Sequence, residues 1–333
     1  MKRPSRTRLV DLARLSGVSV MTVSRALRGL EGVSEEKRSE ILSLAQQLHY
    51  LPDMSARSMA MANSNLVGIA LPTLFNDVFA DVLSGMRGTF RSTGFATVVE
   101  TTDYDPALEA EWVDRLLSWR PAGIVLTGFD HMPRTRQRLM DARVPVVEIW
   151  DVTDDPIDLC VGIDHVAAGI SLGNHVRAHG YRRPAFIGAP AGRDSRAERR
   201  IEGLSTAFDQ PLTVSRPTQT NAFEAGFAAT IDLLSREPRP DVLFCLNDHI
   251  AFGAIMGCKR SGVPVPQDIG VVGFNNLPLS NVLDVALTTM HTPRREMGVL
   301  AARAILARAN GVRGPKVHEL ACTLIKGASI RLQ

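Results

Sequence analysis

A short run of residues near the amino terminus has the side-chain types and spacing that suit contacts with DNA. It contains two apolar side chains, three hydroxyls and one arginine: Ser19, Val20, Met21, Thr22, Ser24 and Arg25. On a helix whose first turn lies in a major groove, Val20, Met21 and Arg25 would point outward to base edges. Thr22 and Ser24 would lie nearer the phosphates. The run therefore predicts a DNA-reading helix.

The charge of the chain supports this prediction. The net charge is +3, and residues 1–60 hold ten Lys and Arg against six Asp and Glu. The remaining residues hold 28 basic against 29 acidic side chains. A compact basic segment gains binding free energy by releasing counterions from a phosphate backbone. Composition alone would equally fit a solvated tail, so the helical pattern has to decide between the two.

That pattern predicts a helix-turn-helix within a headpiece of three helices. Leu9, Leu12, Ala13 and Leu15 recur at helical spacing, Gly17 permits a tight turn, and Ser19 is a suitable N-cap for the second helix. Residues 33–37 resemble a capping start for a third helix, whose apolar set is Ile41, Leu42, Leu44, Ala45 and Leu48. Pro52 ends it, and residues 54–60 form a helix too short to be stable alone.

The rest of the chain alternates short apolar runs with helical periods, which is typical of parallel sheets covered on both faces. The predicted strands are residues 66–71, 95–99, 123–127, 144–149, 184–188, 242–246 and 270–274, and the helical stretches between them include 79–90, 107–119, 166–179, 196–208 and 250–261. At about six strands per sheet, this pattern indicates two doubly wound subdomains. Ligands of such sheets bind beyond the carboxyl ends of the strands, so two facing subdomains form a cleft.

The sequence gives little support for metal binding, disulfide bonds or catalysis. The four cysteines lie far apart without a CxxC pair, which favours buried thiols in a reducing cytoplasm. His175 and His179 have a spacing that could grip a metal, but no third ligand accompanies them. We expect no export signal, no membrane span, no metal, no cofactor and no catalytic constellation. The alternative is a solute-binding or enzymatic α/β protein with an incidental helix-turn-helix.

The amino-terminal motifs resemble the headpiece of the LacI/GalR family of bacterial repressors. They are Val-Asp-Leu-Ala at 10–13, Gly-Val-Ser at 17–19, Thr-Val-Ser-Arg-Ala-Leu at 22–27, Val-Ser at 33–34 and Tyr-Leu-Pro at 50–52. In that family the segment after the proline is a hinge helix that folds on the operator and wedges a leucine into the minor groove. The resemblance puts Met59 at the wedge position, where it departs from the family's usual leucine, and adds Arg57 to the DNA-binding residues. A residue of the dimer contact is the other explanation for Met59.

The resemblance continues through the large domain, which implies a fold like that of periplasmic sugar-binding proteins. The gluconate-utilisation repressors of the family share Pro-Thr-Leu at 72–74, Val-Phe-Ala at 78–80, Leu-Ser-Trp at 117–119, Pro-Arg-Thr at 133–135, Pro-Val-Val-Glu at 145–148 and Thr-Pro-Arg at 292–294. Matching these motifs places ten residues at the cleft as effector-binding candidates: Phe79, Thr127, Trp150, Asp164, Arg200, Phe223, Asn247, Asn275, Thr292 and Arg294.

Asn275 stands where many sugar-responding relatives carry Asp. The loss of a carboxylate fits an anionic effector, which Arg200 and Arg294 could hold; salt bridges within the protein are the other explanation for these two arginines. The expected domains are a headpiece (1–50), a hinge helix and linker (51–65) and an effector domain (66–333). The effector domain comprises subdomain N (about 66–164 and 292–314) and subdomain C (about 165–291 and 315–333).

Together these features predict a transcriptional repressor in the cytoplasm, at the nucleoid. We expect it to bind a palindromic, double-stranded operator as a homodimer and to be released by a small sugar acid such as gluconate. A tetramer is not expected, because no leucine heptads follow the last apparent strand. The operator bases, the exact effector and the choice between induction and co-repression stay open.

Overall fold

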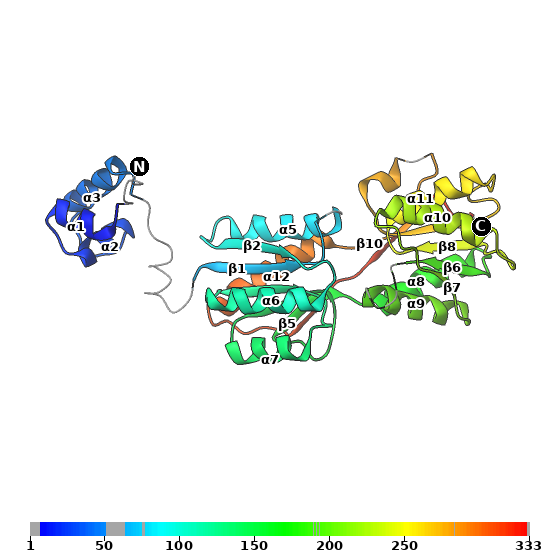
Figure 1. The fold of residues 1–333 in the computed structure, drawn as a ribbon, viewed down its shortest axis with the longest axis horizontal. Coiled ribbons are helices and arrows are strands. Elements are labelled where there is room, and N and C mark those ends of the chain that lie inside the picture. Colours follow the sequence, from blue (N-terminus) through cyan, green and yellow to red (C-terminus); the bar gives the residue numbers. More distant parts are fainter. Residues whose placement is uncertain are drawn as a thin grey trace. The chain divides into compact units, whose positions relative to one another are not determined.

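The structure is a computed structural model that describes residues 7–50, 64–74, 77–188, 190, 192, 194–282 and 284–331. The chain divides into two compact units, Met1–Ser64 and Asn65–Gln333 (Figure 1). The predicted hinge helix at 54–60, with Arg57 and Met59, lies outside the described residues.

The first unit contains the three predicted helices, α1 (Leu9–Ser16), α2 (Val20–Leu27) and α3 (Glu35–Gln47). The Ser19 side chain accepts a hydrogen bond from the Thr22 backbone N–H, and Gly17 has the left-handed φ of +67° that the tight turn requires. Their core consists of Leu12, Ala13, Val23, Ala26, Ile41 and Ala45. Two residues expected in this core, Leu15 and Leu42, are 56% and 46% exposed instead. Three short helices bury only a narrow stripe each, so the flanks of each apolar set stay in solvent.

The N-subdomain of the second unit is built on a parallel six-stranded sheet with the order β11-β5-β4-β3-β1-β2. Its strands are β1 (Leu66–Leu71), β2 (Ala96–Thr101), β3 (Gly123–Thr127), β4 (Val146–Asp151), β5 (Leu159–Ile163) and β11 (Val317–Glu319). Its helices are α5 (Asp77–Phe90), α6 (Pro106–Ser118), α7 (Pro133–Ala142) and α12 (Arg294–Ala309).

The C-subdomain repeats this plan with the strand order β12-β10-β9-β8-β6-β7, in which only β12 is antiparallel. Its strands are β6 (Pro184–Ile187), β7 (Thr213–Ser215), β8 (Val242–Cys245), β9 (Gly270–Asn275), β10 (Thr288–His291) and β12 (Thr323–Ile325). Its helices are α8 (His165–Ala178), α9 (Ser195–Phe208), α10 (Ala222–Leu234) and α11 (Asp248–Arg260), with the 3-10 turn η1 (Pro278–Asn281) after β9.

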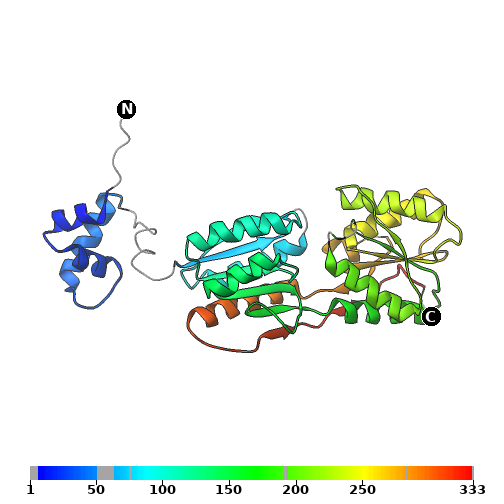
Figure 2. The same ribbon diagram turned by 60° about the horizontal axis from the view of Figure 1, so that its bottom comes forward.

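Both sheets are covered by helices on two faces, as the near-continuous apolar strands predict (Figure 2). In the N-subdomain, Val67 and Ile69 pack with α5 and α12, whereas Ala70 packs with α6 on the opposite face. In the C-subdomain, Phe186 and Phe244 pack with α8 and α9, and the alternate residues of β6 and β8 pack with α10 and α11. The predicted fold of two doubly wound subdomains is confirmed.

Three connections join the subdomains, and the third differs from our expectation. The first follows β5, the second lies between β10 and α12, and the third lies between β11 and β12. We expected residues 315–333 to belong to subdomain C, but β11 pairs with β5 in the N-subdomain sheet. Three-residue strands such as β11, β12 and β7 carry too short an apolar pattern to be recognised, and we predicted none of them.

Candidate functional site

The DNA-reading candidates of the first unit lie together on the exposed side of α2. Val23 and Ala26 face the core, while Val20, Met21 and Arg25 are exposed, with Met21 at 70%. Large apolar side chains left in solvent at the start of a basic helix suit contact with thymine methyl groups. Ser19 and Thr22 also hydrogen-bond through their hydroxyls at 2.9 Å, which stabilises the first turn of the helix.

A cleft between the subdomains forms the candidate effector site, which we call the cleft pocket. It encloses about 450 Å³ of space, open to solvent. It lies at the carboxyl ends of the strands, where the N-termini of α8, α9 and α11 also meet. Helix N-termini present unpaired N–H groups and favour negative charge. The lining residues are Val78, Phe79, Tyr104, Trp150, His165, Asp194, Arg196, Arg200, Leu246, Asn247, Phe274 and Asn275.

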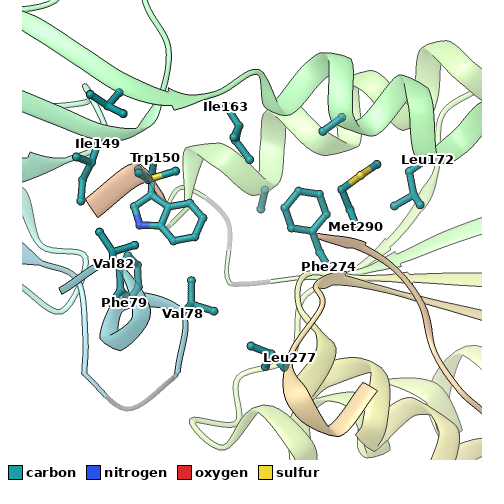
Figure 3. Close-up of a cluster of buried hydrophobic side chains, with 14 of the residues drawn as sticks. Val78, Phe79, Val82, Ile149, Trp150, Ile163, Leu172, Phe274, Leu277 and Met290 are labelled. Carbon is teal, nitrogen blue, oxygen red and sulfur yellow. The ribbon is translucent and has the colours of Figure 1, made fainter. Parts of the chain in front are cut away.

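Aromatic side chains from both subdomains frame this pocket. Phe79 on α5 meets Trp150 edge to face, with ring centroids 5.6 Å apart, and Phe274 lies on the C-subdomain side (Figure 3). Trp150 has a φ of +81°, which is costly for a bulky residue and is typical of functional sites. The Arg200 guanidinium stacks 4.2 Å from the Phe274 ring centre. The aromatic surfaces therefore position one indole and one guanidinium at the same pocket.

The buried charges of the pocket do not balance. Arg196 Nε donates to Asp194 Oδ1 at 2.9 Å, so these two charges pair with each other. Within the described part of the chain, Arg200 donates only to backbone oxygens, of Leu246 at 2.9 Å and of Arg196 at 3.3 Å. Burial lowers the pKa of Arg200 to about 10 in spite of the attraction of Asp194, and Arg196 lowers it further. Arg200 is thus a buried cation without a carboxylate partner among the described residues.

Two further side chains of the pocket have polar atoms that make no hydrogen bond within the described part of the chain. They are Trp150, through Nε1, and His165, whose Nε2 lies 3.7 Å from Asp151 Oδ1, beyond hydrogen-bonding distance. Both side chains are buried, and buried polar groups without partners are costly unless a ligand or water satisfies them. Burial lowers the pKa of His165 well below its usual value, and Arg200 and Arg196 lower it further. The imidazole is therefore neutral and supplies one donor and one acceptor.

Five of the ten effector-binding candidates line the cleft pocket: Phe79, Trp150, Arg200, Asn247 and Asn275. Thr127 lines a neighbouring pocket. Asp164 and Thr292 line neither pocket; the Asp164 carboxylate caps α8 at the Ala167 N–H, and Thr292 is buried. Phe223 is 43% exposed on α10, against His249 and Phe252.

Arg294 is placed differently from Arg200. Its Nε donates to Asp81 Oδ2 at 2.9 Å, and its Nη1 donates to the Asn275 carbonyl and to Thr292 Oγ1. These contacts join α5, α12 and the end of β9 at a connection between the subdomains. Arg294 therefore forms a salt bridge within the protein, as the second explanation for this arginine proposed. The residue does not line the cleft pocket.

Sequence reasoning missed seven of the lining residues: Val78, Leu246, Phe274, Tyr104, His165, Asp194 and Arg196. One signal was available for the last two. Asp194 lies two residues before the helical period at 196–208, and an N-cap aspartate after a strand marks a helix N-terminus at the carboxyl edge of the sheet. Tyr104 follows β2 in a turn, with no pattern to indicate where its ring lies.

The neighbouring pocket, which we call the side pocket, is more polar. It encloses about 630 Å³, also open to solvent, and is lined by Pro72, Thr102, Tyr104, Asp105, Pro106, Glu109, Thr127, Gly128, Asp130, His131, Gly192, Asp194, Ser195 and Arg196. At its base His131 Nδ1 lies 2.6 Å from Glu109 Oε1, and His131 Nε2 lies 3.3 Å from Glu148 Oε1. Burial alone would lower the pKa of His131, but the two carboxylates raise it to about 9.

Within the described residues, no group of three or more His, Cys, Asp or Glu side chains is arranged to hold a metal ion. The helices of the same part of the chain are all too short or too polar to cross a bilayer.

Comparison with known proteins agrees with both halves of this description. Residues 8–53 match the family described as "Bacterial regulatory proteins, lacI family", and residues 174–330 match "Periplasmic binding protein-like domain". The chain is 34% identical to the HTH-type transcriptional regulator GntR of Escherichia coli (strain K12), over 99% of both chains. It is 32% identical to the regulator IdnR of the same strain, over 92% of this chain and 93% of that protein.

A solved structure agrees as well. The crystal structure of a LacI family transcriptional regulator from Silicibacter pomeroyi superimposes with a TM-score of 0.90 at 35% identity, over 98% of this chain and all of that one. The expected resemblance to the LacI family is confirmed, and it extends over nearly the whole chain to the regulators GntR and IdnR.

Proposed function

Because this chain belongs to the LacI family of DNA-binding transcriptional repressors, we propose that it binds a palindromic operator as a homodimer and releases it when a small sugar acid such as gluconate occupies the cleft pocket. The protein then acts at the nucleoid, in the cytoplasm, and needs no catalytic step.

The proposal about the effector depends mainly on Arg200, the buried cation of the cleft pocket that has no carboxylate partner among the described residues. Asp194 and Arg196 neutralise each other, which leaves the charge of Arg200 for a ligand carboxylate. A guanidinium binds a carboxylate through charge-assisted hydrogen bonds and gains most in a desolvated site. A neutral sugar would leave this buried charge uncompensated, which is costly.

The unpaired donors of Trp150 and His165 suit the same ligand. A sugar acid offers several hydroxyl and carboxylate oxygens as acceptors, and Phe79 and Phe274 offer apolar surface to the carbon chain. Asn275 supports this assignment, because an aspartate at its position would repel the carboxylate. Its Oδ1 accepts from Thr292 at 3.2 Å, which orients the amide.

Operator reading requires two headpieces, since one helix-turn-helix reads a half-site. The exposed apolar stripe on α10 supports a dimer through the C-subdomain. Phe223, Phe227 and Ile231 are spaced four residues apart on one helical face, and Met256 on the neighbouring α11 is also exposed. An apolar surface of this kind is typical of contacts between protein chains.

Titration with gluconate, followed by Trp fluorescence and by operator release, tests the effector proposal. We expect the wild-type protein to bind gluconate and to lose operator affinity as it does so. We expect Arg200→Gln to weaken gluconate binding about 10- to 100-fold, the range for a hydrogen bond to a charged group. Operator affinity without ligand should stay unchanged, because Arg200 belongs to the other compact unit.

Two variants serve as controls. Arg295→Gln removes an exposed arginine outside the pocket and should leave gluconate binding intact. Arg25→Ala should cost about 1 kcal/mol or more on the operator, while gluconate still binds. The proposal is wrong if the wild-type protein ignores every sugar acid, or if Arg200→Gln responds to gluconate as the wild type does.

A further inference from the structure

The cleft pocket and the side pocket share one wall. Tyr104, Asp194 and Arg196 line both pockets. The Arg196 guanidinium carbon lies 5.8 Å from the centre of the Tyr104 ring, so the two side chains stand against each other. This wall decides how far a ligand that is anchored at Arg200 can extend.

Within the wall, Asp194 and Arg196 form an ion pair, whereas Tyr104 contributes an uncharged ring. The Asp194 carboxylate accepts from both the backbone N–H and Nε of Arg196. Burial by itself would raise the pKa of Asp194, but Arg196 and Arg200 lower it, so the aspartate stays charged. Removing either partner would leave a buried charge unpaired, which is strongly destabilising. Removing the Tyr104 ring leaves this ion pair in place.

The backbone also sets Tyr104 apart. Asp103 and Tyr104 have φ values of +50° and +62°, in the left-handed region where glycine is favoured. A turn that places a bulky side chain in this region is held by its surroundings and occurs most often at functional sites. Here it directs the tyrosine ring to the boundary between the pockets.

The side pocket has the chemistry of a sugar subsite. It is lined by hydroxyls and carboxylates, including Thr102, Asp105, Asp130 and Ser195. Asp105 Oδ1 accepts from the Ala107 N–H, and Asp130 Oδ2 accepts from Ser195 Oγ. The second carboxylate oxygen of each aspartate makes no hydrogen bond to a described residue, so it can accept one from a sugar hydroxyl.

We propose that Tyr104 limits the effector to a single sugar-acid unit, because its ring closes the cleft pocket off from a side pocket suited to a glycosyl group. This inference rests on the proposed function of the cleft pocket. Tyr104 is then a specificity-determining residue: it excludes sugar acids that carry a second sugar and is not needed for the acid itself.

Gluconate and lactobionate, which is gluconate bearing a galactosyl group, are the probes that test this inference. Tyr104→Gly removes the ring and suits the left-handed backbone, so we expect the variant to fold. The wild-type protein should bind lactobionate about 100-fold more weakly than gluconate, near the upper range of steric discrimination by a pocket. Tyr104→Gly should bind both within about tenfold of each other.

Three matched variants test whether the Tyr104 ring itself excludes lactobionate. Tyr104→Phe keeps the ring and should still exclude lactobionate. Asp103→Gly relaxes the neighbouring residue, keeps the ring and should also exclude it. Asp105→Asn preserves the helix cap, because Asn caps as well as Asp. Added to Tyr104→Gly, it should weaken lactobionate binding about fivefold and leave gluconate binding unchanged, as expected for the loss of about one hydrogen bond.

The outcomes separate the two proposals. If the wild-type protein binds lactobionate as well as gluconate, or if Tyr104→Gly binds gluconate but still excludes lactobionate, Tyr104 does not set the length of the effector. If the wild-type protein binds neither probe nor any other sugar acid, the proposed function fails and this inference fails with it.

Discussion

The side chains of His131 and His165 are both almost completely buried in the second unit, yet the fold makes one of them charged and the other neutral. His131 lies between Glu109 and Glu148, which outweigh the effect of burial and raise its pKa to about 9. His165 lies among Arg196, Arg199 and Arg200, which add to the effect of burial and lower its pKa. At neutral pH His131 is therefore a structural cation, and His165 is a neutral donor and acceptor for a ligand.

The raised pKa of His131 predicts a loss of stability at alkaline pH. The unfolded-state pKa of histidine is about 6.5, so the stabilisation is complete below that pH and disappears as the pH rises through about 9. A pKa difference of this size between the folded and unfolded states contributes on the order of 3 kcal/mol to the free energy of unfolding. Urea unfolding of the wild-type protein at pH 7 and pH 9.5 should show the loss, and His131→Gln should show a much smaller one. Equal losses in the two proteins would contradict this assignment.

At the scale of elements, the pair α10 and α11 shows how packing leaves one surface unpaired. The helices approach closely because Gly226 and Gly253 have no side chains: a Cβ at Gly226 would lie 2.0 Å from the Ile250 carbonyl oxygen, and one at Gly253 equally close to that of Phe223. With their small faces packed together, the larger apolar side chains of α10 stay at the surface. This arrangement supports the proposal that these exposed side chains of α10 contact a second copy of the chain.

Phe227→Glu tests this surface. A charge in the centre of an apolar dimer contact costs several kcal/mol, because it is desolvated without a partner. We expect the variant to sediment as a monomer at micromolar concentration and to lose operator affinity. Met140→Glu changes an even more exposed apolar residue on α7 of the N-subdomain and should leave the dimer intact. A dimeric Phe227→Glu would place the contact elsewhere.

At the scale of the molecule, Arg199 joins the two subdomains without lining the cleft pocket. From α9 its Nη2 donates to Asp151 Oδ1 at the end of β4 at 2.7 Å, and its guanidinium stacks 4.5 Å from the Phe129 ring centre. It also lies 3.8 Å from Asp130. All three partners belong to the N-subdomain, so this arginine stabilises the arrangement of the two subdomains that the structure shows.

We therefore expect the substitution Arg199→Met to change the coupling between effector binding and operator binding. The variant keeps an unbranched apolar side chain and loses the bridge, so we expect the arrangement of the subdomains seen in the structure to be less populated before the ligand binds. We expect about 5- to 30-fold more gluconate for half release of the operator, a coupling change of about 1 to 2 kcal/mol. Asp130→Asn removes the charge of the more distant partner but keeps an oxygen that can accept from Ser195 Oγ, so it should change this midpoint little. An unchanged midpoint for Arg199→Met would show that the bridge does not govern closure.

Linkage adds a check that does not depend on any variant. If gluconate weakens operator binding by some factor, the operator must weaken gluconate binding by the same factor. Calorimetric titration of gluconate into the free protein and into its operator complex measures that factor directly. Equal affinities in the two titrations would exclude thermodynamic coupling.

The sequence by itself determined those features that depend on neighbouring residues. Apolar periodicity and capping residues such as Ser19 and Ser34 predicted the three helices of the headpiece, and apolar runs predicted seven strands, because helices and strands bury one face at a regular spacing. The exposure of Val20, Met21 and Arg25 followed from the same periodicity, since Val23 and Ala26 occupy the buried face.

Only the tertiary structure decided which charged side chains remain available to a ligand. Arg200 and Arg294 were equivalent candidates in the sequence, but Arg294 is paired with Asp81, which lies 213 residues away along the chain. His131, Tyr104 and Arg196 gain their surroundings in the same way, from segments that meet only after the two sheets have formed. Pairing and burial depend on groups that are remote in sequence, and local periodicity carries no information about them.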